Sequence, residues 1–263
     1  MNFQFKDKYN IEDMLNIMAI LRSPEGCPWD KEQTHKSIRS CFIEETYEAV
    51  EAIDNDDSEL LQEELGDVLL QVLFHSQLEK EKGSFDFSDV VDGIAKKMIV
   101  RHPHVFGDTV VSNSDEVLVN WDAIKKQTKS QSSQTEVLQS VSKALPALMR
   151  SAKVQHKAAK VGFDWPDVSG ALDKVAEETG ELKEAVASGS QEGCVEELGD
   201  LLFSVVNVAR FLEVEPEHAL SLSCDKFISR FQKMEQLAKE RKVDMDSSTL
   251  EQLDSLWNEI KAN

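Results

Sequence analysis

The chain has 263 residues, enough for one large domain or two small ones, and 41% of them are hydrophobic, so a folded core is expected. Its formal net charge of −20 argues against nucleic acids and anionic membranes as partners, because so acidic a protein repels polyanions at long range. If the substrate is itself a polyanion, cations must mediate the contact; the alternative is that the charge serves solubility alone.

The N-terminal segment and the cysteines indicate a cytoplasmic protein. Residues 1–10 are charged and polar, and the apolar stretch 14–21 is too short to span a bilayer and lacks the layout of a signal peptide. The cysteines, at positions 27, 41, 194 and 224, form no Cys-x-x-Cys pair, which argues against a zinc site or a disulfide framework. We therefore expect free thiols in a reducing compartment.

The first acidic motif predicts a helical hairpin. Glu45 and Glu48 are three residues apart, as are Glu64 and Asp67, so each pair shares one helix face. The intervening segment 54–58, Asp-Asn-Asp-Asp-Ser, has the chemistry of a turn followed by an N-cap. At about 1.5 Å per residue, both pairs lie ~9 Å from that turn. An antiparallel helix pair would therefore bring four carboxylates together.

The region after this hairpin also favours helices. Apolar residues recur at helical spacing through 60–73, and no alternating pattern is long enough for a strand. Lys97 and Arg101 are one helical turn apart. His102 and His104 could form a metal pair, but a helix end at Pro103 explains them better. Residues 127–136 are polar and resemble a linker.

The second half repeats the first. Glu-Glu-Thr-Tyr-Glu at 44–48 returns as Glu-Glu-Thr-Gly-Glu at 177–181, and Glu-Glu-Leu-Gly-Asp at 63–67 returns at 196–200. Lys97, Arg101 and Trp121 have counterparts in Lys226, Arg230 and Trp257. The sequence therefore predicts an all-α chain of two tandem modules, 1–129 and 137–263.

Four converging carboxylates repel one another, and a divalent cation removes that penalty. Because all the ligands would be oxygen, the ion would be hard, such as Mg²⁺ or Mn²⁺. Gly66 and Gly199 interrupt the second helix of each pair, which predicts close approach of another helix or a ligand. The alternative is that each acidic motif is a solvated helix face, and duplication would copy such a face too.

These motifs resemble those of the all-α nucleoside triphosphate pyrophosphohydrolases. The resemblance rests on Glu-Glu-x-x-Glu, a hairpin and Glu-x-x-Asp, in tandem. The tandem arrangement is similar to that of the MazG proteins. Three further motifs carry this part of the resemblance, namely Cys-Pro-Trp-Asp at 27–30, Arg-His-Pro-His-Val-Phe at 101–106 and Gly-Phe-Asp-Trp at 162–165. It implies a four-helix-type module that dimerises, binds Mg²⁺ and cleaves many nucleoside triphosphates to the monophosphate and pyrophosphate. A role in nucleotide-pool housekeeping or regulation would follow.

The resemblance also implies site residues. The metal ligands would be Glu178, Glu181, Glu197 and Asp200, with Glu45, Glu48, Glu64 and Asp67 as a possible second quartet. Glu177 would act with Glu178 in catalysis, by orienting the attacking water or holding a further ion. Substrate contacts would come from Lys174, Lys226, Arg230 and Trp257.

Alternatives remain for several of these residues. Trp257 could be a core residue in place of a base-stacking one, Lys226 and Arg230 could form a solvated face, and Glu177 could be a bystander. The halves differ at position 174, where the N-terminal half has Cys41, so we expect the C-terminal module to be the main catalytic one.

Two other classes of function are alternatives to the pyrophosphohydrolase hypothesis. A di-iron bundle needs two Glu-x-x-His motifs in its core, and the strings at 32–35 and 215–218 lie near predicted helix starts. A non-catalytic protein whose acidic helices bind a basic partner would release no pyrophosphate.

Overall fold

The computed structural model describes residues 3–128 and 131–262, and within them it contains helices and no β-strand. The chain divides into two compact units, Met1–Lys125 and Lys126–Asn263. The predicted all-α fold is thereby confirmed. None of the helices in the described residues is both long and apolar enough to cross a membrane.

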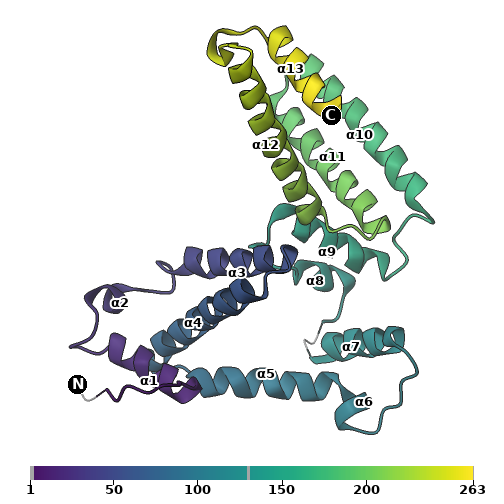
Figure 1. Cartoon of the computed structure of the whole chain (residues 1–263). Helices are drawn as coiled ribbons and strands as arrows, with labels where there is room; N and C mark the ends of the chain where they lie inside the picture. Colours follow the sequence, from purple (N-terminus) through teal and green to yellow (C-terminus); the bar gives the residue numbers. More distant parts are fainter. Residues whose placement is uncertain (1–2, 129–130, 263) are drawn as a thin grey trace. The chain divides into compact units, whose positions relative to one another are not determined.

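The N-terminal unit is built around one long helical hairpin, α3 with α4 (Figure 1). Helices α1 and α5 both contact α4, and α6 contacts α5. The helices are α1 (Ile11–Leu21), α2 (Pro28–Glu32), α3 (Arg39–Asp54), α4 (Ser58–Lys82), α5 (Phe87–Arg101), α6 (Pro103–Phe106) and α7 (Ser114–Thr128).

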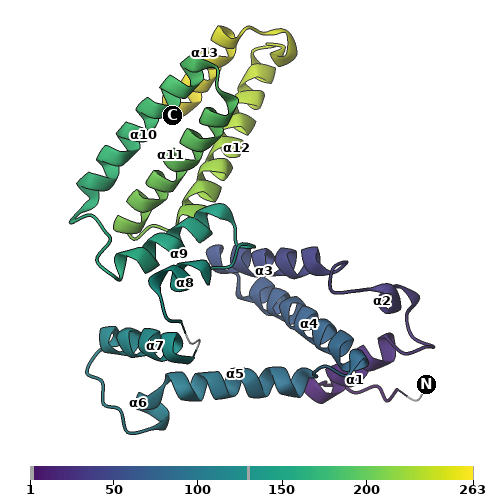
Figure 2. The same ribbon diagram turned by 180° about the vertical axis from the view of Figure 1, so that it is seen from behind.

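The C-terminal unit repeats this plan with the hairpin of α10 and α11, which lie side by side in both views (Figures 1 and 2). Helix α9 packs on α11, and α12 packs on α13. The helices are α8 (Gln134–Gln139), α9 (Ala147–Ala159), α10 (Val168–Ser188), α11 (Gln191–Phe211), α12 (Pro216–Glu240), the 3₁₀ turn η1 (Met245–Ser247) and α13 (Leu250–Ala262).

Local sequence explains both hairpin turns. In the first, Asp56 adopts φ 53°, and the Asp57 carboxylate accepts the backbone N–H groups of Glu59 and Leu60. In the second, Gly189 ends α10 at φ 71°, a conformation that glycine adopts without steric cost, and Ser190 caps α11 by accepting the N–H of Gly193. Each turn thus reverses the chain within a few residues and sets the two helices antiparallel.

The linker prediction holds only in part. Residues 129 and 130 lie outside the described residues. Both ends of the expected linker are helical. Residues 127 and 128 belong to α7, and at the other end the Ser133 hydroxyl accepts the N–H of Glu136 and starts α8. That capping signal outweighs the polar composition of the segment.

The second helices of the two hairpins differ in length by about one turn. Helix α4 has 25 residues and α11 has 21. The extra turn lies beyond the carboxylate motif of α4, so Lys97 follows Asp67 by 30 residues, whereas Lys226 follows Asp200 by 26.

The interior glycines meet open space. A Cβ atom at Gly66 or Gly199 would have no other atom within 4 Å, leaving aside the helix's own backbone nearby. The expectation of close packing by another helix is therefore wrong within the described chain. Both positions remain open to a ligand or to a second molecule.

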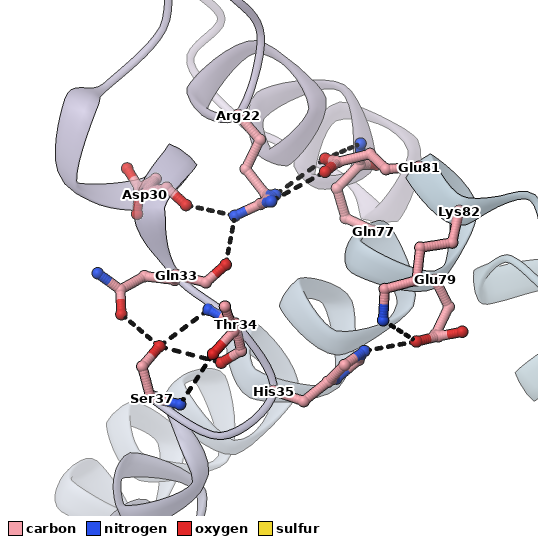
Figure 3. Close-up of polar contacts among 10 residues, drawn as sticks. All are labelled: Arg22, Asp30, Gln33, Thr34, His35, Ser37, Gln77, Glu79, Glu81 and Lys82. Atoms are coloured by element: carbon pink, nitrogen blue, oxygen red, sulfur yellow. Dashed lines mark hydrogen bonds and ion pairs between the residues drawn. The ribbon is translucent and has the colours of Figure 1, made fainter.

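A polar network ties the segment before α3 to the end of α4 (Figure 3). Arg22, whose side chain is almost buried, donates to both carboxylate oxygens of Glu81 and to the carbonyl of Gln33. His35 bonds the Glu79 carboxylate through Nε2 at 2.6 Å and His75 through Nδ1 at 2.8 Å. These contacts fix the entry into the acidic hairpin.

The substitution Glu79→Gln is expected to destabilise the N-terminal unit near neutral pH. Hydrogen bonds from Lys82 and His35 lower the pKa of Glu79 from 4.5 to about 2 in the folded protein. A carboxylate with a lowered pKa contributes stability above its unfolded pKa and loses it as the pH falls through the folded value. The difference in melting temperature between wild type and variant should therefore shrink between about pH 4.5 and pH 2.

Asp92→Asn is the matched control, since Asp92 pairs with Lys96 in an exposed contact one turn along α5. Exposed pairs of this kind contribute little to stability. A Glu79→Gln defect of equal size at every pH would show that lost packing, and not the ionised carboxylate, is responsible.

Candidate active site

The C-terminal hairpin brings three of the four predicted ligands within coordinating distance. Oxygen atoms of Glu178, on α10, and of Glu197 and Asp200, on α11, all lie within 4.8 Å of one another. We call these three residues with Glu181 the C-terminal carboxylate cluster. Glu181 lies outside the 4.8 Å group, yet burial and the charges of Glu178 and Glu197 raise its pKa.

Glu178 is the buried member of this cluster. Its side chain is only 5% exposed, and its Oε2 atom is buried without a hydrogen-bond partner in the structure. A buried carboxylate oxygen that lacks a partner costs free energy, because it has lost its hydration. The unpartnered atom and the all-oxygen donor set fit a hard divalent ion such as Mg²⁺ or Mn²⁺.

Lys174 supplies positive charge to the other oxygen of Glu178. Its Nζ atom lies 2.6 Å from Oε1 of Glu178 and 2.8 Å from Oε1 of Glu177. Hydrogen bonds to Glu177 and Glu178 hold the pKa of the Lys174 ammonium well above its usual value. The sequence predicts that Lys174 contacts the substrate. In the structure its ammonium group contacts the carboxylates of Glu177 and Glu178.

The N-terminal hairpin forms a similar cluster. Oxygen atoms of Glu45, Glu48 and Glu64 lie within 4.8 Å of one another, and Glu64 is 8% exposed. We call these residues with Asp67 the N-terminal carboxylate cluster. Burial is the largest cause that raises the pKa of Glu45 and of Glu64, followed by the charge of Asp67 for Glu45 and of Glu48 for Glu64.

No lysine or arginine in the described part of the chain forms an ion pair with the N-terminal cluster. The position equivalent to Lys174 is Cys41, a half-buried free thiol. The two clusters therefore have carboxylates at the same sequence positions, but they differ in which three of them meet and in the ammonium beside them.

The remaining predicted substrate residues lie on α12 and α13. Lys226 is exposed and Arg230 half-buried, one turn apart on α12. Trp257 packs beside Phe227, with ring centroids 5.1 Å apart, against the core formed around Met234. Among the described residues, no hydrogen bond or ion pair joins these side chains to the C-terminal cluster. The packing of Trp257 favours the core alternative for much of its ring.

The di-iron alternative finds no support in the described residues. His35 follows α2 and joins the network of Figure 3, and Glu215 caps α12 by accepting the N–H of His218. Neither carboxylate cluster contains a histidine. His102 ends α5 ahead of Pro103, as expected, with its Nδ1 atom 2.6 Å from the carbonyl of Met98.

Comparison with known proteins identifies these hairpins. The sequence model of the MazG nucleotide pyrophosphohydrolase domain matches residues 33–106 and 168–234, which contain the two acidic hairpins. The chain belongs to the MazG nucleotide pyrophosphohydrolase family. The family, and with it the predicted class of enzyme, is confirmed.

Relatives match over nearly the whole chain. The nucleoside triphosphate pyrophosphohydrolase/pyrophosphatase MazG of Thermotoga maritima is 44% identical over 95% of this chain and 95% of its own length. The nucleoside triphosphate pyrophosphohydrolase of Escherichia coli K12 is 43% identical over 95% of this chain and 97% of its own. The Bacillus subtilis protein YabN, described as uncharacterised, is 51% identical over 94% of this chain, which spans half of that protein.

Proposed function

We propose that the C-terminal unit hydrolyses nucleoside triphosphates to the monophosphate and pyrophosphate, with Mg²⁺, or Mn²⁺ in its place, held by Glu178, Glu181, Glu197 and Asp200. The observation that carries this proposal is the unpartnered buried oxygen of Glu178 within a carboxylate cluster on the hairpin that the family shares. Relatives named as nucleoside triphosphate pyrophosphohydrolases support the reaction. Nucleotide-pool housekeeping or regulation is the corresponding role.

Burial and charge indicate a different role for each side chain near the metal ion. When bound, the divalent ion supplies positive charge that draws the triphosphate to an otherwise repulsive acidic site. Glu178 is held rigidly by burial, which suits a ligand. Glu177 is 56% exposed beside it, which suits a group that accepts a hydrogen bond from the attacking water and orients it.

The phosphate chain also needs cations from the protein. Lys226 and Arg230 present two positive side chains one turn apart, and a guanidinium can bind two phosphate oxygens at once. Trp257 is half-buried against Phe227, so only the exposed part of its ring is available to a base. Stacking on that part would not distinguish one base from another, which suits a broad substrate range.

We further propose that the chain acts as a homodimer. Its exposed surface is 18655 Å², whereas two separate folded proteins of half its mass would together expose only ~14,000 Å². Contact between the units only lowers the exposed area, so the excess does not depend on their arrangement. The excess of ~4,700 Å² per chain is at least as large as the area that one chain buries in an obligate dimer.

The apolar side chains that a dimer would cover lie on matching faces of the two hairpins. Helix α11 exposes Val195, Leu198, Leu202 and Val205, which share one face. The counterparts of Leu198 and Leu202 on α4 are Leu65 and Leu69, and both are exposed. Monomeric proteins rarely expose apolar stripes of this kind, so a second copy is the occupant we propose.

Incubation of the full chain with a panel of nucleoside triphosphates tests the reaction. We expect the nucleoside monophosphate and pyrophosphate in equal amounts with Mg²⁺, and neither when a chelator removes the ion. Anion-exchange separation of the products distinguishes the cleavage position. Orthophosphate with a nucleoside diphosphate would overturn the proposal, as would equal rates with and without the chelator.

A further inference from the structure

In the C-terminal cluster, the ammonium group of a lysine on the same helix already contacts one oxygen of the buried Glu178 carboxylate. Lys174 contacts Oε1 of Glu178 at 2.6 Å, while Oε2 of the same carboxylate has no partner. The ammonium therefore neutralises the group that is expected to bind the metal. A second cation at Glu178 has to compete with the first for the same negative charge.

We propose that Lys174 is an exchangeable counter-ion, which neutralises Glu178 in the empty site and moves to a phosphate oxygen when metal and nucleotide bind. This rests on the proposed function, since it requires a divalent ion at Glu178. Metal without nucleotide then binds weakly, because it meets the charge of Lys174. Metal with nucleotide binds well, because the triphosphate offers Lys174 a new partner.

The geometry suits an exchange more than a permanent bond. The Lys174 side chain is 37% exposed and long, so it can reorient without disturbing the core. Lysine precedes glutamate at this spacing of four residues, which is the less favourable order on a helix. The ion pair is therefore not a major support of α10, and the ammonium can leave once a metal ion neutralises Glu178 in its place.

The other half of the chain provides an internal comparison. The N-terminal cluster has acidic residues at the same sequence positions, although Glu48 and not Asp67 belongs to its 4.8 Å group, and Cys41 stands where Lys174 would be. An ion entering the N-terminal cluster meets no ammonium of this kind. The proposal therefore predicts that free metal favours the N-terminal cluster, whereas metal with nucleotide favours the C-terminal one.

The test measures Mn²⁺ binding by electron paramagnetic resonance without nucleotide. The full chain carries Glu64→Gln, which weakens the N-terminal cluster so that the C-terminal one is observed. In that background Lys174→Met is expected to raise the Mn²⁺ affinity ~10-fold, because one like charge is removed close to the ion. Lys174→Arg retains the charge and is expected to leave the affinity low.

Lys183→Met is the matched control, since Lys183 is exposed on the opposite side of α10 and the change in net charge is the same. It should alter the Mn²⁺ affinity less than twofold. Binding of a non-hydrolysable nucleoside triphosphate with Mn²⁺ gives the second measurement. There Lys174→Met is expected to weaken the analogue ~10-fold, because the phosphate chain loses a cation.

The two possible failures can be told apart. If Lys174→Met and Lys183→Met bind Mn²⁺ equally while Glu178→Gln loses it, the exchange is wrong and the metal site stands. If Glu178→Gln binds Mn²⁺ as tightly as its parent, the metal site of the proposed function is wrong, and the exchange falls with it.

Discussion

Glu178→Gln is expected to lower the rate of pyrophosphate release by ~100-fold or more, since loss of a metal ligand costs at least as much as loss of a group that orients one. Glutamine has nearly the same size and keeps a polar oxygen, so the substitution removes the charge and disturbs packing little. The buried position of Glu178 allows no neighbouring carboxylate to replace it without a shift of α10. Coupled detection of pyrophosphate, with Mg²⁺ in excess, measures the rate.

Glu184→Gln provides the control for this experiment, because Glu184 is exposed on the same helix and the change in charge is identical. Its rate should stay within about twofold of wild type, as expected for a surface substitution away from the site. Glu45→Gln makes the equivalent change in the N-terminal cluster. A large loss there, with Glu178→Gln active, would move the catalytic site to the other unit.

The hairpins and their clusters could be predicted because their signals are local. The polar segment 54–58 and the three-residue spacing of the acidic pairs fix a turn and two helix faces. In the C-terminal unit these features bring Glu178, Glu197 and Asp200 within coordinating distance. Glu181 lies outside this group although it is nearer the turn than Glu178, so the three-residue spacing alone does not fix which carboxylates meet.

Other features depend on contacts that spacing does not reveal. His35 contacts His75 and Glu79, which lie 40 and 44 residues away in the sequence, so no local pattern predicts the network. The ion pair of Lys174 with Glu178 has a visible signal, namely their spacing of four residues. The family resemblance assigns Lys174 to the substrate and does not indicate this ion pair. Likewise, one tryptophan in an amphipathic helix predicts equally a core residue and a stacking platform, and only packing distinguishes them.

The double substitution Leu69→Glu/Leu202→Glu is expected to convert the proposed homodimer into a monomer. Both side chains are exposed in the single chain, at 40% and 49%, on corresponding faces of α4 and α11. In a dimer they would lose their contact with water, so a carboxylate at either position would be buried without a partner. Light scattering coupled to gel filtration should then report 29.6 kDa in place of twice that mass.

The two single variants show which hairpin contributes more to the interface. The variant in that hairpin should give the larger decrease in average mass at low protein concentration. Leu250→Glu is the control, because Leu250 is 71% exposed in the first turn of α13, where an acidic residue is favourable. Circular dichroism should show unchanged helix content in every variant. A double variant that keeps both its helices and the doubled mass would place the interface elsewhere, and the exposed stripes of α4 and α11 would then need a different partner.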